Sequence, residues 1–277
     1  MIDLLWTVAR PLRAALSGQA VETRSMYVPT EGGWDIHLRV ARLATGSGRR
    51  PAVLVVPGLG TPARAIEAWS LPVNLGELAR LGVVATAVDL SGRGRSWGTD
   101  VYGGPEHHGD VRTALRTLAA DPDVDATRIG VISLSLGCAA VAGALASTDR
   151  PEVGWWIDWE GPSDRDVITA HGHRMGPAMG HSMDDDAYWF PREAMRMVGN
   201  TGVPYVRFQA WRDHAQPGEL RHAERMIHAA AAGRLPWFQL NDHPRNDVPA
   251  NPTWMTPGNR VARTWFHNRV RALARLP

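Results

Sequence analysis

Ser133-Leu134-Ser135-Leu136-Gly137 follows a hydrophobic run, Ile129 to Ile132, and precedes a run of small residues, Cys138 to Ala146. The first run is typical of a buried strand and the second of a closely packed helix. A sharp turn from strand to helix pushes one hydroxyl outward and needs small residues two positions before and two after it. Ser133 and Gly137 supply them, although Ser133 stands where the pattern usually has glycine. Ser135 is therefore the candidate nucleophile.

The rest of the chain predicts the setting of this turn. Most of the strand-like runs are separated by helical stretches, and they lie at 35–43, 52–56, 83–88, 129–134, 153–159, 205–210 and 237–240. Strands that alternate with helices predict an α/β protein whose mostly parallel sheet is covered on both faces. A short run at 26–28, just before the first of these, indicates an antiparallel hairpin at the sheet edge. Such a sheet binds ligands beyond the carboxyl ends of its strands, and Ser135 lies at one of those ends.

Three further segments accompany the serine turn. Residues 55–60 (Val-Val-Pro-Gly-Leu-Gly) and 89–96 (Asp-Leu-Ser-Gly-Arg-Gly-Arg-Ser) follow predicted strands, and 185–192 (Asp-Asp-Ala-Tyr-Trp-Phe-Pro-Arg) holds a Tyr-Trp-x-x-Arg string. In this order the four segments resemble the α/β-hydrolases, nearest to the branch of dienelactone-hydrolase-like, X-Pro-peptidase and cocaine-esterase-like enzymes. Pro57 stands where many members have histidine. The resemblance covers about 33–246 and implies an eight-stranded sheet.

The resemblance also implies a catalytic triad in the chain order serine, acid, histidine. Asp213 follows the predicted strand 205–210 and is the expected acid. His243 follows the last predicted strand and is the expected general base. Other residues compete for these two roles: Glu160 for the acid, and His214 and His222 for the base.

The oxyanion hole implied by the resemblance is made of backbone N–H groups. One belongs to Leu136, directly after the nucleophile, and the other to Leu59 in the loop after the strand 52–56. Backbone donors have no side-chain signature. Both positions therefore rest on the family comparison.

Residues 163–202, between the sixth and seventh predicted strands, are expected to form a small cap insertion over the site. They are too few for a bulky lid, which favours a small or medium substrate. The aspartate run 184–186 is expected to cap a short helix. The candidate pocket residues are Trp97, Tyr188, Trp189, Trp211 and His214.

Length and composition predict one catalytic domain over 1–277, with 44% hydrophobic residues for its core. The lone Cys138 excludes an intramolecular disulfide, is expected to be a buried structural thiol, and favours a cytoplasmic location. Charges are mixed along the chain, so we expect no nucleic-acid partner. No apolar run has the length of a transmembrane helix, so stable membrane insertion is not expected. His171 and His173 match no metal-ligand spacing, and no metal or cofactor is expected. The sequence is compatible with a homo-oligomer as well as with a monomer.

These features predict a metal-independent serine hydrolase that cleaves an ester or related acyl bond of a small-molecule substrate. Serine at the turn, in place of aspartate, argues against dehalogenase and epoxide-hydrolase chemistry. The alternatives are a peptidase of the prolyl-peptidase-like branch, for which Asp158, Glu160 or the aspartate run would hold the substrate amine, and a non-hydrolytic acyltransferase, cyclase or binding protein on the same scaffold.

Overall fold

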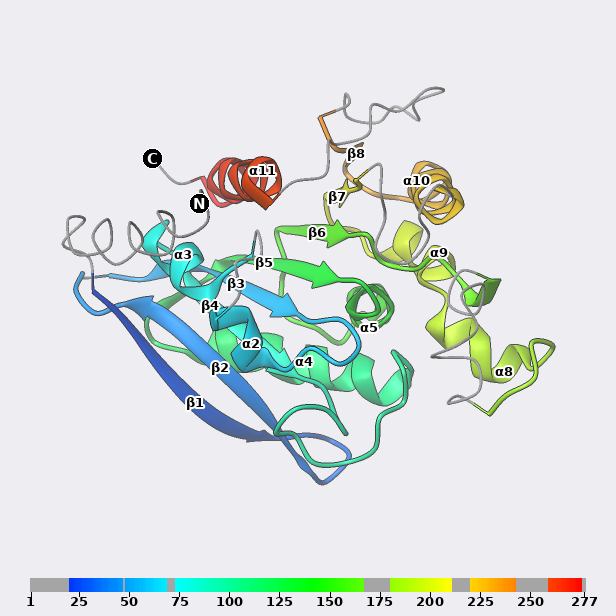
Figure 1. Ribbon diagram of the computed structural model, residues 1–277, viewed down its shortest axis with the longest axis horizontal. Coiled ribbons are helices and arrows are strands. Elements are labelled where there is room, and N and C mark those ends of the chain that lie inside the picture. Colours follow the sequence, from blue (N-terminus) through cyan, green and yellow to red (C-terminus); the bar gives the residue numbers. More distant parts are fainter. Residues whose placement is uncertain are drawn as a thin grey trace, which may run out of the picture.

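The structure, a computed structural model, describes residues 20–46, 48–68, 73–166, 180–210, 220–242 and 259–275. An eight-stranded sheet crosses this part of the chain in the order β1-β2-β4-β3-β5-β6-β7-β8 (Figure 1). The strands are β1 (Val21–Pro29), β2 (Asp35–Leu43), β3 (Arg50–Val56), β4 (Val84–Asp89), β5 (Val124–Leu134), β6 (Trp155–Trp159), β7 (Tyr205–Phe208) and β8 (Phe238–Leu240).

The sheet is mostly parallel, as predicted. β1 pairs with β2 and β2 with β4 in antiparallel fashion, which forms the expected edge hairpin. All pairs from β4 through β3, β5, β6 and β7 to β8 are parallel. Their carboxyl ends therefore meet at one edge of the sheet, which is where such folds place their sites.

Helices cover both faces of the sheet, which confirms the predicted layers. One hydrophobic core lies under α4 (Pro105–Ala120), α5 (Gly137–Ala146), α9 (Ala194–Met197) and α10 (Arg221–Ala232). A second core lies under α2 (Ala63–Ala68), α3 (Leu75–Arg80) and α11 (Asn259–Leu273). Neighbouring residues of β3 alternate between the cores, with Leu54 in the first and Val55 in the second, because side chains on a strand alternate between its faces.

The edge strand is longer than its sequence indicates. Only 26–28 reads as a strand, whereas β1 spans Val21–Pro29 and pairs with β2 along its whole length. Its residues are exposed or half-buried, so the apolar alternation that marks a strand is weak. β5 likewise begins at Val124, five residues before its apolar run. This early start was not predicted because residues 125–128 are only partly buried or exposed and so lack an apolar pattern.

In the described part of the chain between β6 and β7, the short helices are α8 (Asp186–Trp189), the 3₁₀ turns η1 (Phe190–Arg192) and η2 (Val198–Asn200), and α9 between them. Asp185 caps α8 by accepting the N–H of Tyr188, as the aspartate run predicts. Residues 167–179 lie outside the described residues, so the cap at 163–202 stays a prediction. None of the helices in the described ranges combines the length and the apolar character needed to cross a membrane.

Candidate active site

Ser135 stands between β5 and α5 in a left-handed backbone conformation, with φ of 50°. For a residue with a side chain this conformation costs about 1–2 kcal/mol. Its N–H donates to the carbonyl of Trp159 at 2.9 Å, so it is still held by β6 when the chain turns. Its own carbonyl accepts the N–H of Cys138 at 2.9 Å. The local geometry is the strand-turn-helix that the sequence predicts.

The turn packs against the loop that follows β3. A Cβ atom added to Gly137 would lie 2.4 Å from the carbonyl oxygen of Val56 and 2.7 Å from that of Pro57, so a side chain does not fit there. A Cβ added to Gly58 would lie 2.8 Å from the Cβ of Ser135. These two glycines bring the backbone of residues 57–60 against the candidate nucleophile. Leu136 and Leu59, whose amides are the predicted oxyanion donors, flank this contact, and Leu136 is buried while Leu59 is 37% exposed.

Ser133 explains the departure from glycine in the serine turn. Its side chain is fully buried, and its Oγ accepts the indole N–H of Trp156 at 2.9 Å and donates to Asp158 Oδ1 at 3.3 Å. A glycine at this position would remove the partner of a buried indole N–H. The serine therefore belongs to a polar network beneath the turn.

A buried ion pair forms the centre of this network. Asp158 and Arg207 are both inaccessible to solvent, and Arg207 Nη1 lies 2.6 Å from Asp158 Oδ2. The Tyr205 hydroxyl donates to the same carboxylate at 2.8 Å, and Arg207 Nη2 donates to His222 Nδ1 at 3.3 Å. Asp158 is thus enclosed and committed to Arg207, and it is not an open anionic site for a substrate amine. These contacts also hold His222 inside the protein.

Cys138 packs beside this pair. It is fully buried, as expected of a structural thiol. Burial, together with the neighbouring carboxylate of Asp158, raises the pKa of the Cys138 thiol well above its ordinary value. The thiolate, which is the reactive form of cysteine, is therefore disfavoured at this position.

Positive φ recurs at the carboxyl ends of the strands. Ser135, Glu160 and Asn241 directly follow β5, β6 and β8, and their φ angles are 50°, 50° and 51°. In each case the backbone N–H still donates to an adjacent strand before the chain leaves the sheet. The acceptors are the carbonyls of Trp159, Phe208 and Arg207, respectively.

Side chains from two of these residues fix the start of the loop after β7. Glu160, which is 4% exposed, accepts the N–H of Ala210 through Oε1 at 2.8 Å. Asn241 accepts the N–H of Gln209 at 2.9 Å and donates to its carbonyl at 3.0 Å. The chain segments that lead to the expected acid and the expected base are therefore joined at the sheet edge. The sequence pattern gave no sign of Asn241, although asparagine tolerates this backbone conformation better than most residues.

Several predicted site residues lie outside the described residues. They are Trp211, Asp213, His214 and His243. Their roles stay predictions.

Two of the predicted pocket residues gather beside Leu136. Leu136 and the fully buried Trp189 form a small apolar cluster, against which Tyr102 and Tyr188 pack. The ring of Tyr188 is sandwiched between His181, with centroids 3.5 Å apart, and the guanidinium of Arg192, 3.7 Å from the centroid. The short helix α8 thus lies against the residue that follows the candidate nucleophile. Tyr102 has no signal in the sequence.

Arg192, the last residue of the Tyr-Trp-x-x-Arg string, connects α8 to the loop before α4. Its Nε donates to the carbonyl of Val101 at 3.0 Å, and its Nη1 donates to the carbonyl of Tyr188. A Cβ on Gly104 would lie 2.5 Å from the Arg192 guanidinium. The arginine therefore has a structural role in this string.

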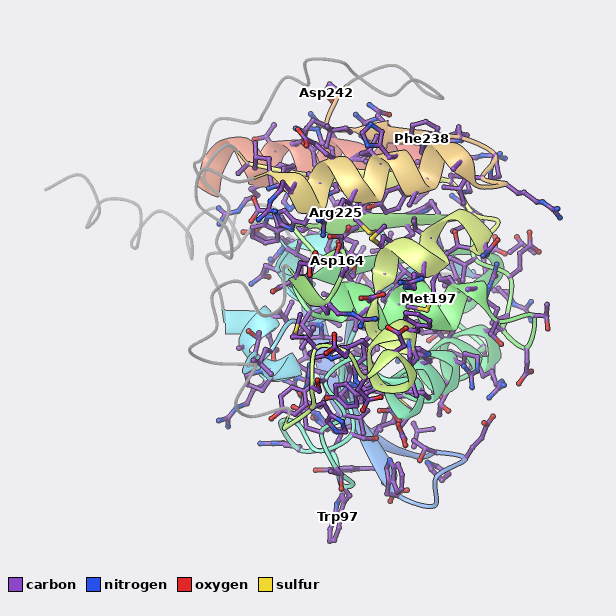
Figure 2. All side chains as sticks on the ribbon, turned by 90° about the vertical axis from the view of Figure 1, so that its right-hand side faces the viewer. Trp97, Asp164, Met197, Arg225, Phe238 and Asp242 are labelled. Carbon is purple, nitrogen blue, oxygen red and sulfur yellow. The ribbon has the colours of Figure 1, made fainter. Side chains whose placement is uncertain are left out.

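Trp97 is 70% exposed and points away from the body of the molecule (Figure 2). The backbone N–H of Trp97 donates to the carbonyl of Asp35 at the start of β2. This exposure does not support its expected place in a pocket wall.

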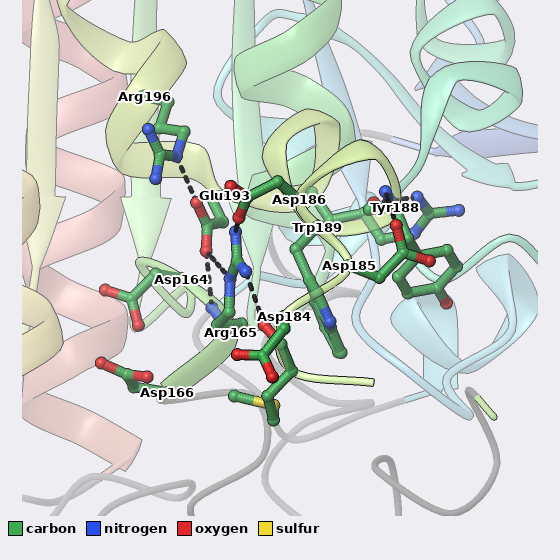
Figure 3. Close-up of polar contacts among 12 residues, drawn as sticks. Asp164, Arg165, Asp166, Asp184, Asp185, Asp186, Tyr188, Trp189, Glu193 and Arg196 are labelled. Atoms are coloured by element: carbon green, nitrogen blue, oxygen red, sulfur yellow. Dashed lines mark hydrogen bonds and ion pairs between the residues drawn. The ribbon is translucent and has the colours of Figure 1, made fainter. Parts of the chain in front are cut away.

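A charged cavity of about 410 Å³ lies between the segment after β6, α9 and α10. Its charged lining residues are Asp164, Asp166, Glu193, Arg165, Arg196 and Arg225. Arg165 binds Glu193 at 2.6 Å and Asp186 at 2.8 Å (Figure 3). Arg225 binds Asp164 at 2.7 Å. Three arginines and three carboxylates balance one another in this cavity, and none of the predicted pocket residues that the structure describes lines it.

No protein-family model matches the chain, and no curated protein matches it in sequence. Solved structures do resemble it. The Pyrococcus furiosus esterase Pf2001 matches with a TM-score of 0.64 and 17% identity, over 92% of this chain and 91% of its own. A Klebsiella pneumoniae protein described as a dienelactone hydrolase matches with a TM-score of 0.63 and 16% identity, over 92% and 99%.

A Mycobacterium tuberculosis peptidase that hydrolyses puromycin matches with a TM-score of 0.64 and 18% identity, over 91% of this chain but only 38% of its own. At these identities the likeness concerns the fold. Strand order, strand direction and these three likenesses agree with one another. The chain therefore has the α/β-hydrolase fold, in the arrangement shared by esterases, dienelactone hydrolases and peptidases of this type.

Proposed function

We propose that this protein is a serine hydrolase that cleaves an ester or related acyl bond of a small or medium substrate through an acyl-enzyme. The observation that carries the proposal is the left-handed conformation of Ser135 at the end of β5, with Gly58 against its side chain. Strained backbone at a strand end is costly and gathers at functional sites. The fold places sites at this edge of the sheet.

In the proposed reaction Ser135 Oγ attacks the substrate carbonyl while His243 takes its proton and then gives it to the leaving group. Water then attacks the acyl-enzyme, with His243 again as base. Asp213 orients His243. The tie between Asn241 and Gln209 supports this assignment, because the segments carrying the acid and the base leave the sheet from these two hydrogen-bonded residues.

The proposed oxyanion donors are the N–H groups of Leu136 and Leu59. The close approach of Gly58 to Ser135 supports this, since it brings the loop that carries Leu59 beside the nucleophile. Leu136 is the N-cap residue of α5, and the backbone N–H groups at the start of a helix have no partner within the helix. Tyr188 is the proposed pocket residue, because it packs at Leu136 and is only half-buried.

The test is labelling with a fluorophosphonate probe, located by peptide mapping, together with turnover of short-chain p-nitrophenyl esters. We expect the label on Ser135 in the wild type, and a loss of turnover of about 10³-fold or more in Ser135→Ala. His243→Ala should lose both, whereas His214→Ala should retain them. A folded wild type with no label on Ser135 would contradict the proposal.

A further inference from the structure

A second serine, histidine and aspartate lie in one row across the edge strands. Ser25 is on β1, His37 on β2 and Asp89 at the end of β4. The register pairs His37 with Asp89, and Ser25 with Arg39 on the same face as His37. His37 Nδ1 lies 2.8 Å from Asp89 Oδ2, and His37 Nε2 lies 3.0 Å from Ser25 Oγ. These residues are separate from the site at Ser135.

The other partners of Asp89 decide the direction of each hydrogen bond. Asp89 accepts the N–H of Ala63 at 2.6 Å and the N–H of Arg95 at 3.1 Å, so its oxygens act as acceptors. His37 Nδ1 must then carry a proton and donate it to Asp89. In the neutral ring Nε2 consequently has the lone pair and accepts the hydroxyl proton of Ser25. The three groups therefore have the relationship that a serine nucleophile, its base and its orienting acid have in hydrolases.

The candidate nucleophile is open to solvent, whereas its two partners are buried. The side chains of His37 and Asp89 are each 1% exposed, which fixes the imidazole, whereas Ser25 is exposed. Arg39 Nη1 donates to Ser25 Oγ at 3.3 Å, and Arg39 is itself held by Glu67 through Nε at 2.8 Å and Nη2 at 3.0 Å. A fixed cation thus lies beside the oxygen, where an oxyanion formed on an attacked carbonyl would gain stabilisation.

We propose that Ser25 is a second nucleophilic serine, which small activated esters and fluorophosphonates acylate or phosphonylate at the protein surface. With an ester, Ser25 Oγ forms a bond to the acyl carbon, and the bond from that carbon to the leaving-group oxygen breaks. With a fluorophosphonate, Oγ forms a bond to phosphorus, and the bond from phosphorus to fluorine breaks to release fluoride. The hydroxyl proton passes to His37 Nε2 and then to the leaving group. Water then attacks the acyl carbon with His37 as base, and the bond from that carbon to Ser25 Oγ breaks, which releases the carboxylic acid and restores the serine.

Peptide mapping separates this site from Ser135. Cleavage after Arg24 and Arg39 releases residues 25–39, in which Ser25 is the only serine. We expect fluorophosphonate on this peptide in the wild type and equally in Ser135→Ala, and none in Ser25→Ala. The result does not depend on the proposed function, because the label on Ser135 is read on a different peptide, 129–165, since the bond between Arg150 and Pro151 resists cleavage.

A matched control uses Thr23, whose hydroxyl on the same strand accepts from the same Arg39 at 2.7 Å. In Thr23→Ser the hydroxyl at position 23 should label at least about 10²-fold more slowly than Ser25, because, of these two described residues, it is Ser25 that bonds to the histidine base. His37→Gln should slow Ser25 to the same level. Arg39→Gln, at a half-buried position, should also slow the labelling of Ser25. This variant replaces His37→Gln in the test if His37→Gln does not fold. Equal labelling of positions 23 and 25 in folded protein would overturn the proposal.

Discussion

The carboxamide of Asn241 bonds to both backbone groups of Gln209, accepting its N–H at 2.9 Å and donating to its carbonyl at 3.0 Å. All four groups are buried, since neither residue is more than 2% exposed. Asn241 directly precedes the segment that carries His243, and Gln209 precedes the one that carries Asp213. This double contact sets the distance between the two chain segments where they leave the sheet.

Asn241→Gly tests this role, because glycine accepts the φ of 51° and removes only the side-chain bonds. We expect the free energy of unfolding to fall by about 1–3 kcal/mol, because the buried groups of Gln209 lose their partners. The kcat for p-nitrophenyl esters should fall more than KM changes. Asn241→Asp, which keeps the acceptor for the Gln209 N–H, should be intermediate in stability. Urea unfolding and ester kinetics measure both, and an unchanged kcat in folded Asn241→Gly would refute the positioning role.

A pair of conservative substitutions tests which of Glu160 and Asp213 is the acid of the triad. Glu160→Gln keeps an Oε1 acceptor for the N–H of Ala210, so we expect kcat to change by less than about tenfold if Glu160 only braces the loop. Asp213→Asn should lower kcat by about 10⁴-fold, because the base then loses its orienting carboxylate. Ester kinetics on the two purified variants give the answer. The reverse order of effects would identify Glu160 as the acid.

Elements with a strong local pattern were predictable from the sequence. The serine turn, the parallel strands and the aspartate cap of α8 are set by neighbouring residues, so their signals lie within a few positions. β1 was only partly predicted because it is an edge strand without a buried face along most of its length. The short helices after Phe190 have too few turns for a helical period to emerge.

The polar contacts were not predictable. Asp158 and Arg207 lie on neighbouring strands but are 49 residues apart in the sequence. His37 and Asp89 also lie on neighbouring strands and are 52 residues apart. Each of these residues alone is compatible with an ordinary surface position. Only the strand order, which brings β2 beside β4 and β6 beside β7, joins them.

Ser133 is expected to stabilise the fold rather than to react. In Ser133→Ala the indole N–H of Trp156 loses its acceptor in a fully buried site, so the free energy of unfolding should fall by about 1–3 kcal/mol. Fluorophosphonate labelling of Ser135 should persist in this variant. Chemical denaturation and peptide mapping on one preparation measure the two effects. Stability equal to the wild type would show that the network beneath the turn does not depend on the serine.

Two buried histidines at the start of α4 make stability depend on pH. His107 Nε2 donates to the carbonyl of Ser91 at 3.0 Å, and His108 Nε2 donates to that of Gly103 at 2.9 Å. Burial lowers the pKa of His107 to about 3 and that of His108 to about 4. Both rings are neutral in the folded protein at pH 5, whereas an unfolded histidine binds a proton below about pH 6.5.

Because these folded pKa values lie below the unfolded one, the stabilisation is complete above about pH 6.5 and is lost as the pH falls toward 4. The loss at pH 5 relative to pH 7 is about 2 kcal/mol for His108. Asp110 acts in the opposite sense, since burial raises its carboxyl pKa to about 6 and protonation then favours the folded state. It offsets about 1 kcal/mol over the same interval.

His108→Gln isolates one of these contributions, because glutamine keeps an N–H donor for Gly103 and does not titrate. We expect urea unfolding to show wild-type stability falling between pH 7 and pH 5, and the fall to be smaller in His108→Gln by about 2 kcal/mol. His267→Gln is the comparison, since His267 lies on α11 with a pKa lowered to about 4 but is 22% exposed, so its contribution should be smaller. Parallel pH dependences for wild type and His108→Gln would mean that the imidazole of His108 is not held neutral by the fold.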